Sequence, residues 1–129
     1  MAFRVENMSF KQGQELRITA LAKSGASHFT INIGHNDENY ALHISPRFSS
    51  NKLVLNSLSG GCWGEEQHEM HFPFQTGEEF KLVINFNNEQ FYIKLPDGHM
   101  IDFANRLGDC KYNHFMVDGD VKIISIKIK

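Results

Sequence analysis

Apolar residues recur at every second position along much of this chain, which is the period of a β-strand with one buried face and not that of a helix. Groups rich in glycine, asparagine, aspartate and proline interrupt the alternation at the intervals typical of an all-β sandwich or barrel. The predicted strands are Leu16–Ala22, Phe29–Ile33, Tyr40–Phe48, Lys52–Leu58, Glu66–Phe72, Phe80–Phe86, Gln90–Leu95, His99–Phe103, His114–Val117 and Val121–Lys129. The segment Asn105–Tyr112 is the one place where the pattern allows a helical turn.

Two of these strands show how a core would form between sheets. In Phe80–Phe86 and Gln90–Leu95 every second residue is phenylalanine, leucine or isoleucine. Such faces are buried when two antiparallel sheets pack against each other. A chain of 129 residues is about the length of one domain. We therefore expect a single domain over residues 1–129 with an all-β fold, a two-sheet antiparallel β-sandwich.

Composition narrows the classes of function. The net charge is −2 and no basic run would neutralise a row of phosphates, so we do not expect nucleic acid as a partner. No stretch approaches the roughly 18 apolar residues of a membrane span, and the first residues lack the apolar segment of a signal peptide. We expect a cytoplasmic protein without membrane insertion, in which Cys62 and Cys110 are free thiols.

The third predicted strand carries hydrogen-bonding side chains that the core does not need. Side chains alternate between the two faces of a strand, so His43, Ser45 and Arg47 are expected to share one face. Tyr40 and Leu42 are expected on the opposite, buried face. The sequence thus predicts a polar surface on the outside of one sheet.

The following segments extend this polar surface. A short turn makes the next strand an antiparallel neighbour, so Asn56 is predicted to join the same face. The only tryptophan, Trp63, lies in a glycine-rich loop whose backbone is free to present its ring to solvent. Glu66 and His68 follow two residues apart and so share one side of their strand.

These residue types suit a sugar ligand. A pyranose ring has an apolar face of C–H groups that stacks on an aromatic ring, and its hydroxyl groups need directed partners. Guanidinium, amide and carboxylate groups supply such partners, and Glu66 would hold the guanidinium of Arg47 in one orientation. Each residue taken alone also has an ordinary structural explanation, such as an exposed ion pair or a core tryptophan.

The order and spacing of these residues resemble the signature of the galectin family. The matching runs are His43–Phe48, Leu53–Ser57 and Trp63–Gln67. The similarity continues through later landmarks of the family, which are Phe72–Gln75, Lys94–Gly98, Asn105–Leu107 and Asp118–Ile123. The resemblance therefore covers essentially the whole chain.

This resemblance implies a jelly-roll-like sandwich of the galectin and concanavalin kind, with one carbohydrate-recognition domain and no metal or cofactor. It implies binding of β-galactosides, such as lactose or N-acetyllactosamine, in a groove on a concave sheet. By position, His43 and Arg47 would bind the axial O4 of galactose, and Trp63 would stack on its ring. Asn56 and Glu66 would bind O6, and Arg47 and Glu66 would also reach O3 of the adjoining sugar.

Two residues depart from the family pattern. The family usually has Asn where this chain has Ser45, and a shorter hydroxyl side chain reaches less far toward O4. It usually has Arg where this chain has His68, which is largely neutral at pH 7. We therefore expect altered specificity or affinity, with mannosides as a further class of ligand. If His68 acts as a cation, binding should strengthen below about pH 6.5.

Three other functions are compatible with this fold class. A glycosidase needs two carboxylates that flank one bond about 5–10 Å apart, whereas Glu65 and Glu66 point to opposite faces of a strand. A metal site at His68 and His71 meets the same objection, so neither catalysis nor metal binding is expected. A galectin-fold interaction or structural protein without sugar binding remains the third alternative.

The resemblance also implies an assembly and a location. Single-domain galectins commonly form homodimers, and galectins often leave the cell without a signal peptide. The terminal strand would place Ile124, Ile126 and Ile128 on one face, which is an aggregation hazard if it is left uncovered. We expect a homodimer whose two sites bind glycans or glycoproteins in the cytoplasm or outside the cell.

Overall fold

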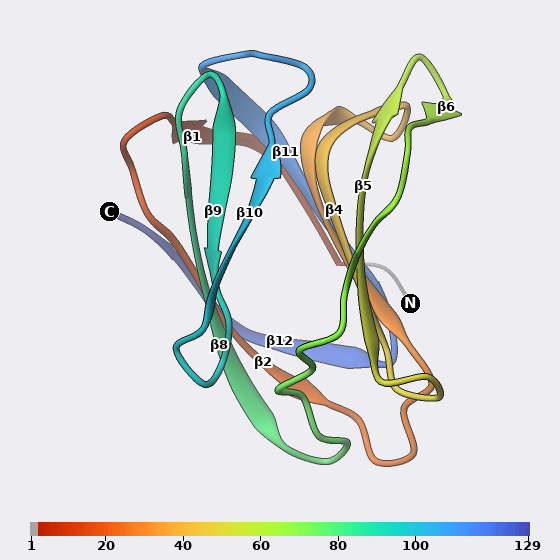
Figure 1. The fold of residues 1–129 in the computed structure, drawn as a ribbon. Helices are drawn as coiled ribbons and strands as arrows, with labels where there is room; N and C mark the ends of the chain where they lie inside the picture. Colours follow the sequence, from red (N-terminus) through yellow and green to blue (C-terminus); the bar gives the residue numbers. More distant parts are fainter. Residues whose placement is uncertain (1–2) are drawn as a thin grey trace.

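Two antiparallel β-sheets packed face to face make up the computed structural model, which describes residues 3–129 (Figure 1). The strands are β1 (Phe3–Lys11), β2 (Leu16–Ala22), β3 (Phe29–Asn36), β4 (Asn39–Arg47), β5 (Lys52–Ser59), β6 (Cys62–Trp63), β7 (Gln67–Glu69), β8 (Glu79–Phe86), β9 (Gln90–Lys94), β10 (Met100–Ala104), β11 (Lys111–Gly119) and β12 (Val121–Ile128). Over these residues there is no helix, and hence none long and apolar enough to cross a membrane. The predicted all-β sandwich is confirmed.

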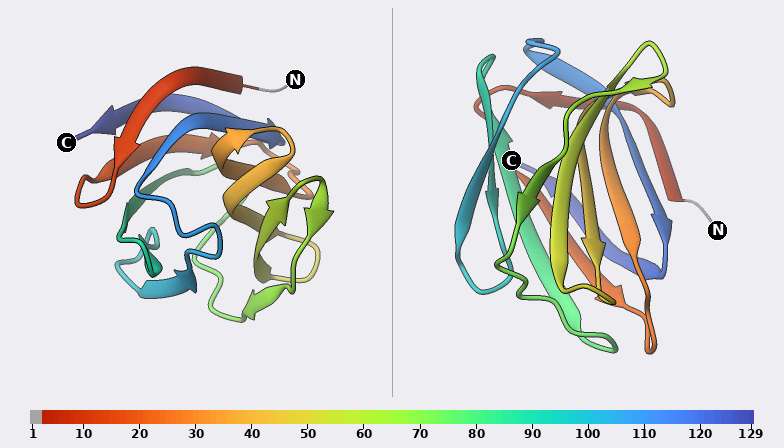
Figure 2. Two further views of the ribbon diagram at one scale, coloured as in Figure 1. Left: turned by 90° about the horizontal axis from the view of Figure 1, so that it is seen from above. Right: turned by 45° about the vertical axis from the view of Figure 1, so that its right-hand side comes forward.

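The larger sheet has the strand order β1-β11-β3-β4-β5-β6, and β7 also pairs with β5. The smaller sheet has the order β10-β9-β8-β2-β12. Two views show the sheets as separate curved layers, with β1 and β12 at the same side of the molecule (Figure 2). Each sheet therefore has one face toward its partner and one face toward solvent.

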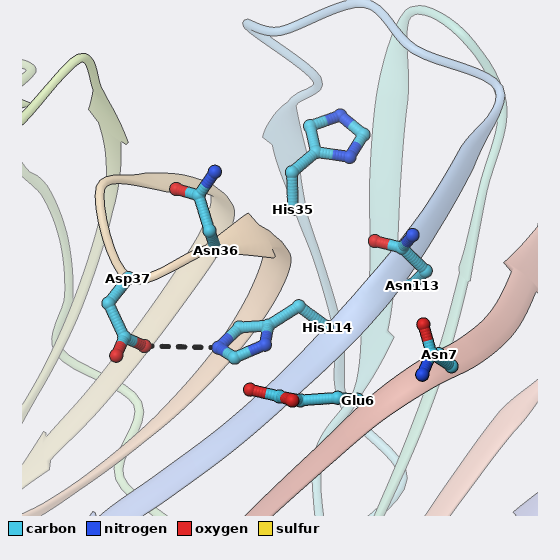
Figure 3. A pocket seen from close by; sticks show the side chains of 7 residues that line it. All are labelled: Glu6, Asn7, His35, Asn36, Asp37, Asn113 and His114. Carbon is cyan, nitrogen blue, oxygen red and sulfur yellow. Dashed lines mark hydrogen bonds and ion pairs between the residues drawn. The ribbon is translucent and has the colours of Figure 1, made fainter.

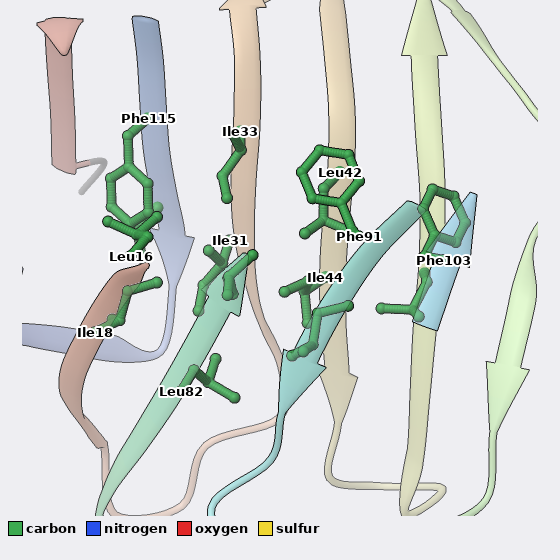
Figure 4. Packing of buried hydrophobic residues seen from close by; sticks show 14 of the residues in the cluster. Leu16, Ile18, Ile31, Ile33, Leu42, Ile44, Leu82, Phe91, Phe103 and Phe115 are labelled. Carbon is green, nitrogen blue, oxygen red and sulfur yellow. The ribbon is translucent and has the colours of Figure 1, made fainter. Parts of the chain in front are cut away.

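The core lies between the inner faces of the two sheets. Side chains of β2, β8 and β9 pack there against side chains of β3, β4 and β11, and Leu82, Phe91 and Ile44 are fully buried among them (Figure 4). The apolar faces predicted for β8 and β9 are confirmed. Burying one large apolar side chain stabilises a fold by roughly 1.5–3 kcal/mol. This core supports the outer face of the larger sheet.

The first strand is one that alternation does not predict. β1 lies at the edge of the larger sheet and pairs only with β11, and most of its side chains are exposed. Its register with β11 shifts between Glu6 and Phe10, and Asn7 has a φ of 61°. This bulge breaks the period of two on which the sequence prediction depends.

A second register shift, in β4, places Tyr40 differently from the prediction. The pairing of β4 with β5 shifts between Tyr40 and His43, so Tyr40 does not share the inward face of Leu42 and Ile44. Its ring instead lies near Trp63, with ring centroids 6.5 Å apart, and its hydroxyl donates to Asp37. Tyr40 is therefore buried, as expected, but it lies outside the main core cluster and beside the polar surface.

Several other segments also differ from the prediction. The expected strand Glu66–Phe72 is paired only over the three residues of β7, because its other residues lack a neighbouring strand. The loop expected around Trp63 contains β6, which pairs with the end of β5. No helical turn forms in Asn105–Tyr112, where β11 already begins at Lys111 and Asn105 holds a turn.

The terminal strand β12 contains a further register shift, between Ile123 and Ser125. As a result Ile123, Ile126 and Ile128 pack against the core, whereas Ile124 is exposed. The prediction that Ile124 shares a face with Ile126 and Ile128 is therefore wrong.

Candidate functional site

The registers of the larger sheet bring the predicted polar residues into adjacent rows on its outer face. One row crosses three strands, with Asn32 of β3 opposite His43 of β4 and His43 opposite Asn56 of β5. In the next row Ser45 of β4 is joined through Val54 of β5 to His68 of β7. We call this outer surface of β3 to β7 the polar face.

His43 is fixed on the polar face by a buried neighbour. Its Nδ1 lies in hydrogen-bonding distance of the Asn32 side-chain oxygen. The amide nitrogen of Asn32 donates to the Met116 carbonyl at 3.1 Å and to the Thr30 hydroxyl at 3.3 Å, so the Asn32 oxygen is the acceptor. His43 Nδ1 therefore carries the proton, and its Nε2 is left with a free lone pair.

Burial keeps His43 neutral. It lowers the pKa of His43 to about 4, and the nearby positive charge of Arg47 contributes in the same direction. Because Nε2 of a neutral imidazole accepts a hydrogen bond once Nδ1 carries the proton, His43 at pH 7 offers an acceptor and not a second donor.

Trp63 supplies an exposed aromatic surface next to His43. β6 pairs with the end of β5, with Trp63 opposite Leu58, and 53% of Trp63 remains accessible to solvent. The ring centroids of Trp63 and His43 lie 4.6 Å apart. The polar face thus contains an aromatic plate whose face is available to a ligand.

Arg47, Glu66 and His68 form a connected group. Arg47 Nη2 lies 3.5 Å from Glu66 Oε2, and His68 Nε2 lies 2.9 Å from Glu66 Oε1. The hydrogen bond from His68 and the positive charge of Arg47 lower the pKa of the Glu66 carboxyl. Glu66 is therefore a carboxylate at neutral pH, with both of its oxygens oriented.

Asn56 is buried on the polar face with its oxygen already occupied. Its Oδ1 accepts from the backbone N–H of Ser57 at 2.7 Å and from Arg106 Nη1 at 3.2 Å. The amide nitrogen of Asn56 is the group left to face a ligand. Arg106 belongs to the turn between β10 and β11, which the sequence associates with the site only as part of a family landmark.

Ser45 lies at the base of a hollow beside His43. The hollow has a volume of about 420 Å³ and is lined by Ser27, His28, Thr30, His43, Ser45, Arg47 and Ser49. Ser45 is nearly inaccessible to solvent, although it lines this space. The polar face therefore continues from the tryptophan across β4 and β3.

A second polar hollow lies where β1, β11 and the β3–β4 turn meet (Figure 3). Asp37 is one of the residues that line it, accepts hydrogen bonds from His114 and Tyr40, each at 3.0 Å, and forms an ion pair with Arg4. These bonds lower the pKa of Asp37, with Arg4 as the largest cause. The cluster fixes Tyr40 beside Trp63.

All seven predicted site residues lie on the polar face, and contacts join most of them. The residues are His43, Ser45, Arg47, Asn56, Trp63, Glu66 and His68. Sequence reasoning missed two supporting residues, Asn32 and Arg106. A signal for Asn32 was present, because it is a polar residue between two isoleucines of a strand.

The two histidines considered for a metal site, His68 and His71, pair with different carboxylates. His68 contacts Glu66, whereas His71 Nε2 lies 2.6 Å from Asp97 and its ring packs against His99. Within residues 3–129 no three histidine, cysteine, aspartate or glutamate side chains are grouped to hold a metal ion. Cys62 and Cys110 are both free and exposed.

Known proteins that resemble this chain in sequence or structure are sugar-binding proteins, in agreement with the geometry of the polar face. A family model described as galactoside-binding lectin matches residues 3–128. A beta-galactoside-binding lectin of Electrophorus electricus is 46% identical over 96% of this chain and 95% of its own length. Galectin-2 of Homo sapiens is 42% identical over 97% of this chain and 95% of its own length. The solved structure of lactose- and MES-liganded congerin II has a TM-score of 0.95 at 33% identity, with 100% of both chains covered.

Proposed function

The chain belongs to the galectin family of galactoside-binding lectins, and from this premise we propose that its polar face binds β-galactosides such as lactose or N-acetyllactosamine. The family consists of carbohydrate-binding lectins, so the chain is a lectin and not an enzyme. The lectin of Electrophorus electricus is named for β-galactosides, and the congerin II structure contains lactose.

The observation that carries the proposal is the polarity of the groups around Trp63. Neutral His43 presents an acceptor, Arg47 presents donors, and the exposed indole offers a plate only 4.6 Å from the imidazole. A hydroxyl group both donates and accepts, so an axial hydroxyl can bond His43 and Arg47 together. The same sugar can then stack the C–H face of its ring on Trp63.

The other end of the site suits a second sugar hydroxyl. Asn56 has its amide nitrogen free to donate, and the Glu66 carboxylate accepts. We assign these two residues to O6 of galactose, and Arg47 with Glu66 to O3 of the adjoining sugar. No metal or cofactor takes part in this scheme.

Ser45 and His68 set the specificity in this proposal. His68 already bonds Glu66 at 2.9 Å, but its ring nitrogen offers a single donor to the carboxylate, whereas a guanidinium offers two parallel N–H donors. Ser45 leaves a hollow where a longer amide would reach a ligand. We therefore propose weaker galactoside binding than a site with Asn and Arg at these positions would give, with mannosides as competing ligands.

Calorimetric titration with lactose, N-acetyllactosamine and mannose tests this function. We expect both galactosides to bind, and His68→Arg to strengthen lactose binding by about tenfold, because a guanidinium is always charged and can hold the Glu66 carboxylate through two N–H groups. His71→Arg, on a histidine that pairs with Asp97 instead, is the matched control and should change nothing. Lactose binding that is tight and indifferent to His68→Arg would refute the assigned role of His68.

The same titration separates the alternatives. Mannose binding without galactoside binding would identify a mannoside lectin, and no sugar binding at all would identify an interaction protein with this fold. Retention of Trp63, Glu66, Arg47 and Asn56 on one face supports the sugar-binding protein. A protein of this fold that no longer binds sugar is expected to have lost at least one of these side chains.

We also propose that two copies associate through the edges of both sheets. An apolar hollow of about 540 Å³ lies between the edge strands β1 and β12, and its lining includes Phe3, Val5, Ile124 and Ile126. Edge strands carry unpaired backbone groups, so two-fold pairing would bury the apolar side chains and satisfy the backbone. A dimer presents two sugar sites and gains avidity for surfaces that carry many glycans.

A further inference from the structure

We infer that Arg106 is a positioning residue for sugar binding, which fixes the Asn56 amide so that its nitrogen, and not its oxygen, is offered to the ligand. Arg106 lies in the turn after β10, far along the chain from the strands of the polar face. The inference rests on the proposed function, because the role of Asn56 toward the sugar O6 belongs to it.

The two hydrogen bonds at the Asn56 oxygen determine the orientation of the amide. The Ser57 N–H donates to it at 2.7 Å and Arg106 Nη1 donates to it at 3.2 Å. Neither a backbone N–H nor a guanidinium can accept a hydrogen bond, so a flipped amide would face two donors with its own N–H groups. Because Asn56 is buried, that arrangement would leave polar groups without partners.

Arg106 is itself held in place by its surroundings. Its Nη1 also donates to the Ser57 hydroxyl at 3.1 Å, and its guanidinium carbon lies 4.6 Å from the centre of the Phe103 ring. The preceding residue, Asn105, is buried and anchors the turn through bonds to the carbonyls of Asn87 and Asp109. The guanidinium is thus oriented before any ligand arrives.

A glycine completes the arrangement. A Cβ added at Gly64 would lie 2.7 Å from Arg106 Nη1, 2.9 Å from the Ser57 hydroxyl and 3.3 Å from Asn56 Oδ1. Glycine at this position therefore lets the chain after Trp63 pass close to Arg106, Ser57 and Asn56, whose side-chain ends a larger residue would have to displace. The turn after β10 and the Trp63 segment are linked through this contact.

This arrangement has a consequence for the ligand. With its oxygen occupied, Asn56 can only donate to a sugar, whereas the Glu66 carboxylate can only accept. A ligand group that contacts both must accept from Asn56 and donate to Glu66, as a primary hydroxyl does. If the sugar carried a carboxylate in place of this primary hydroxyl group, Glu66 would repel it. If it carried a methyl group there, the Asn56 amide would be left without a partner.

The test compares lactose with 6′-deoxylactose, which lacks the hydroxyl in question, on the protein and its Arg106→Met variant. The wild-type protein should prefer lactose by about tenfold or more, since an unpaired buried amide is costly. In Arg106→Met this preference should fall about three- to tenfold, through weaker binding of lactose, while binding of 6′-deoxylactose stays unchanged. Arg17→Met is the matched control, because Arg17 lies on β2 and forms its ion pair with Glu15.

If Arg106 has a purely structural role, Arg106→Met should weaken the binding of lactose and of 6′-deoxylactose equally. If the preference for lactose is unchanged in the variant, Arg106 has no role in orienting Asn56. Either result would overturn the inference. Thermal unfolding followed by circular dichroism verifies that the variant is folded. If Arg106→Met does not fold, Arg106→Lys keeps the charge and one donor group, and its preference for lactose should fall by a smaller factor.

A second measurement needs no sugar and separates this inference from the proposed function. The ¹⁵N order parameter of the Asn56 side-chain amide should be close to that of rigid backbone, about 0.85, and should fall in Arg106→Met. If wild-type protein binds no lactose, the proposed function fails, and this order parameter alone decides whether Arg106 holds the amide. An equal value in both proteins would overturn the inference.

Discussion

At the scale of single residues, buried neighbours decide what the site residues offer to a ligand. Asn32 is buried, yet its oxygen determines which nitrogen of His43 carries the proton. Burial together with Arg47 then lowers the pKa of His43 to about 4. The imidazole therefore acts as a fixed acceptor across the physiological pH range.

The pKa of His43 predicts how stability depends on pH. Between about pH 6.5 and pH 4 the unfolded chain binds a proton at His43 that the folded protein does not. Neutral His43 makes its full contribution to the free energy of unfolding above pH 6.5. This contribution is lost as the pH falls toward 4, and the loss is on the order of 3 kcal/mol. Urea unfolding from pH 7 to pH 4 should show this loss, and His43→Gln should show a shallower slope. An imidazole that titrates near 6.5 by NMR would contradict the prediction.

At the scale of elements, the pairing of β3 with β11 depends on a glycine at the end of β11. Gly119 pairs with Phe29 and has a φ of 99°, and an added Cβ would lie 2.8 Å from Phe29 Cα and 2.9 Å from the His28 carbonyl oxygen. Both atoms are backbone and cannot move away easily. The strand that carries Asn32 is therefore held in register partly by this close approach.

Replacing this glycine should destabilise the fold. Gly119→Ala combines an unfavourable φ with a backbone clash, so we expect the free energy of unfolding to fall by about 2–4 kcal/mol. Gly13→Ala is the matched control, because Gly13 has a φ of 85° but no atom within 4 Å of the added Cβ. It should cost only about 1 kcal/mol. Equal losses in urea denaturation would show that the clash is unimportant.

How much the sequence could predict also differs between elements. Strands with a strict alternation, such as β8 and β9, were predictable because one face is buried along their whole length. Bulges hid the edge strand β1 and reversed the side on which Tyr40 lies. Seven residues of the polar face were predictable from alternation and resemblance, but Asn32 was missed, and the role of Arg106 depends on a contact between distant segments that the sequence does not show.

At the scale of the whole molecule, two edge strands meet beside an apolar hollow, and the proposed dimer would cover it. Ile124 is 50% exposed at this place, since the bulge in β12 turns it away from the core. Large exposed apolar patches on soluble proteins commonly mark an interaction surface.

Sedimentation equilibrium tests the dimer. The wild-type protein should sediment as a dimer, and Ile124→Lys should raise the dissociation constant by about tenfold or more, because it places a charge in the apolar contact. Met70→Lys changes a side chain that is 71% exposed and lies outside the hollow, so it should leave the assembly unchanged. A monomeric wild-type protein at a concentration of about 100 μM would rule out a stable dimer of this kind.

A crystal structure of the protein soaked with lactose would show directly whether the polar face binds galactose. We expect galactose stacked on Trp63, with its axial hydroxyl between His43 Nε2 and Arg47, and with its O6 on the amide nitrogen of Asn56. His68 should remain bonded to Glu66. Lactose bound elsewhere on the molecule, or bound at this face with its ring away from Trp63, would refute the proposed site.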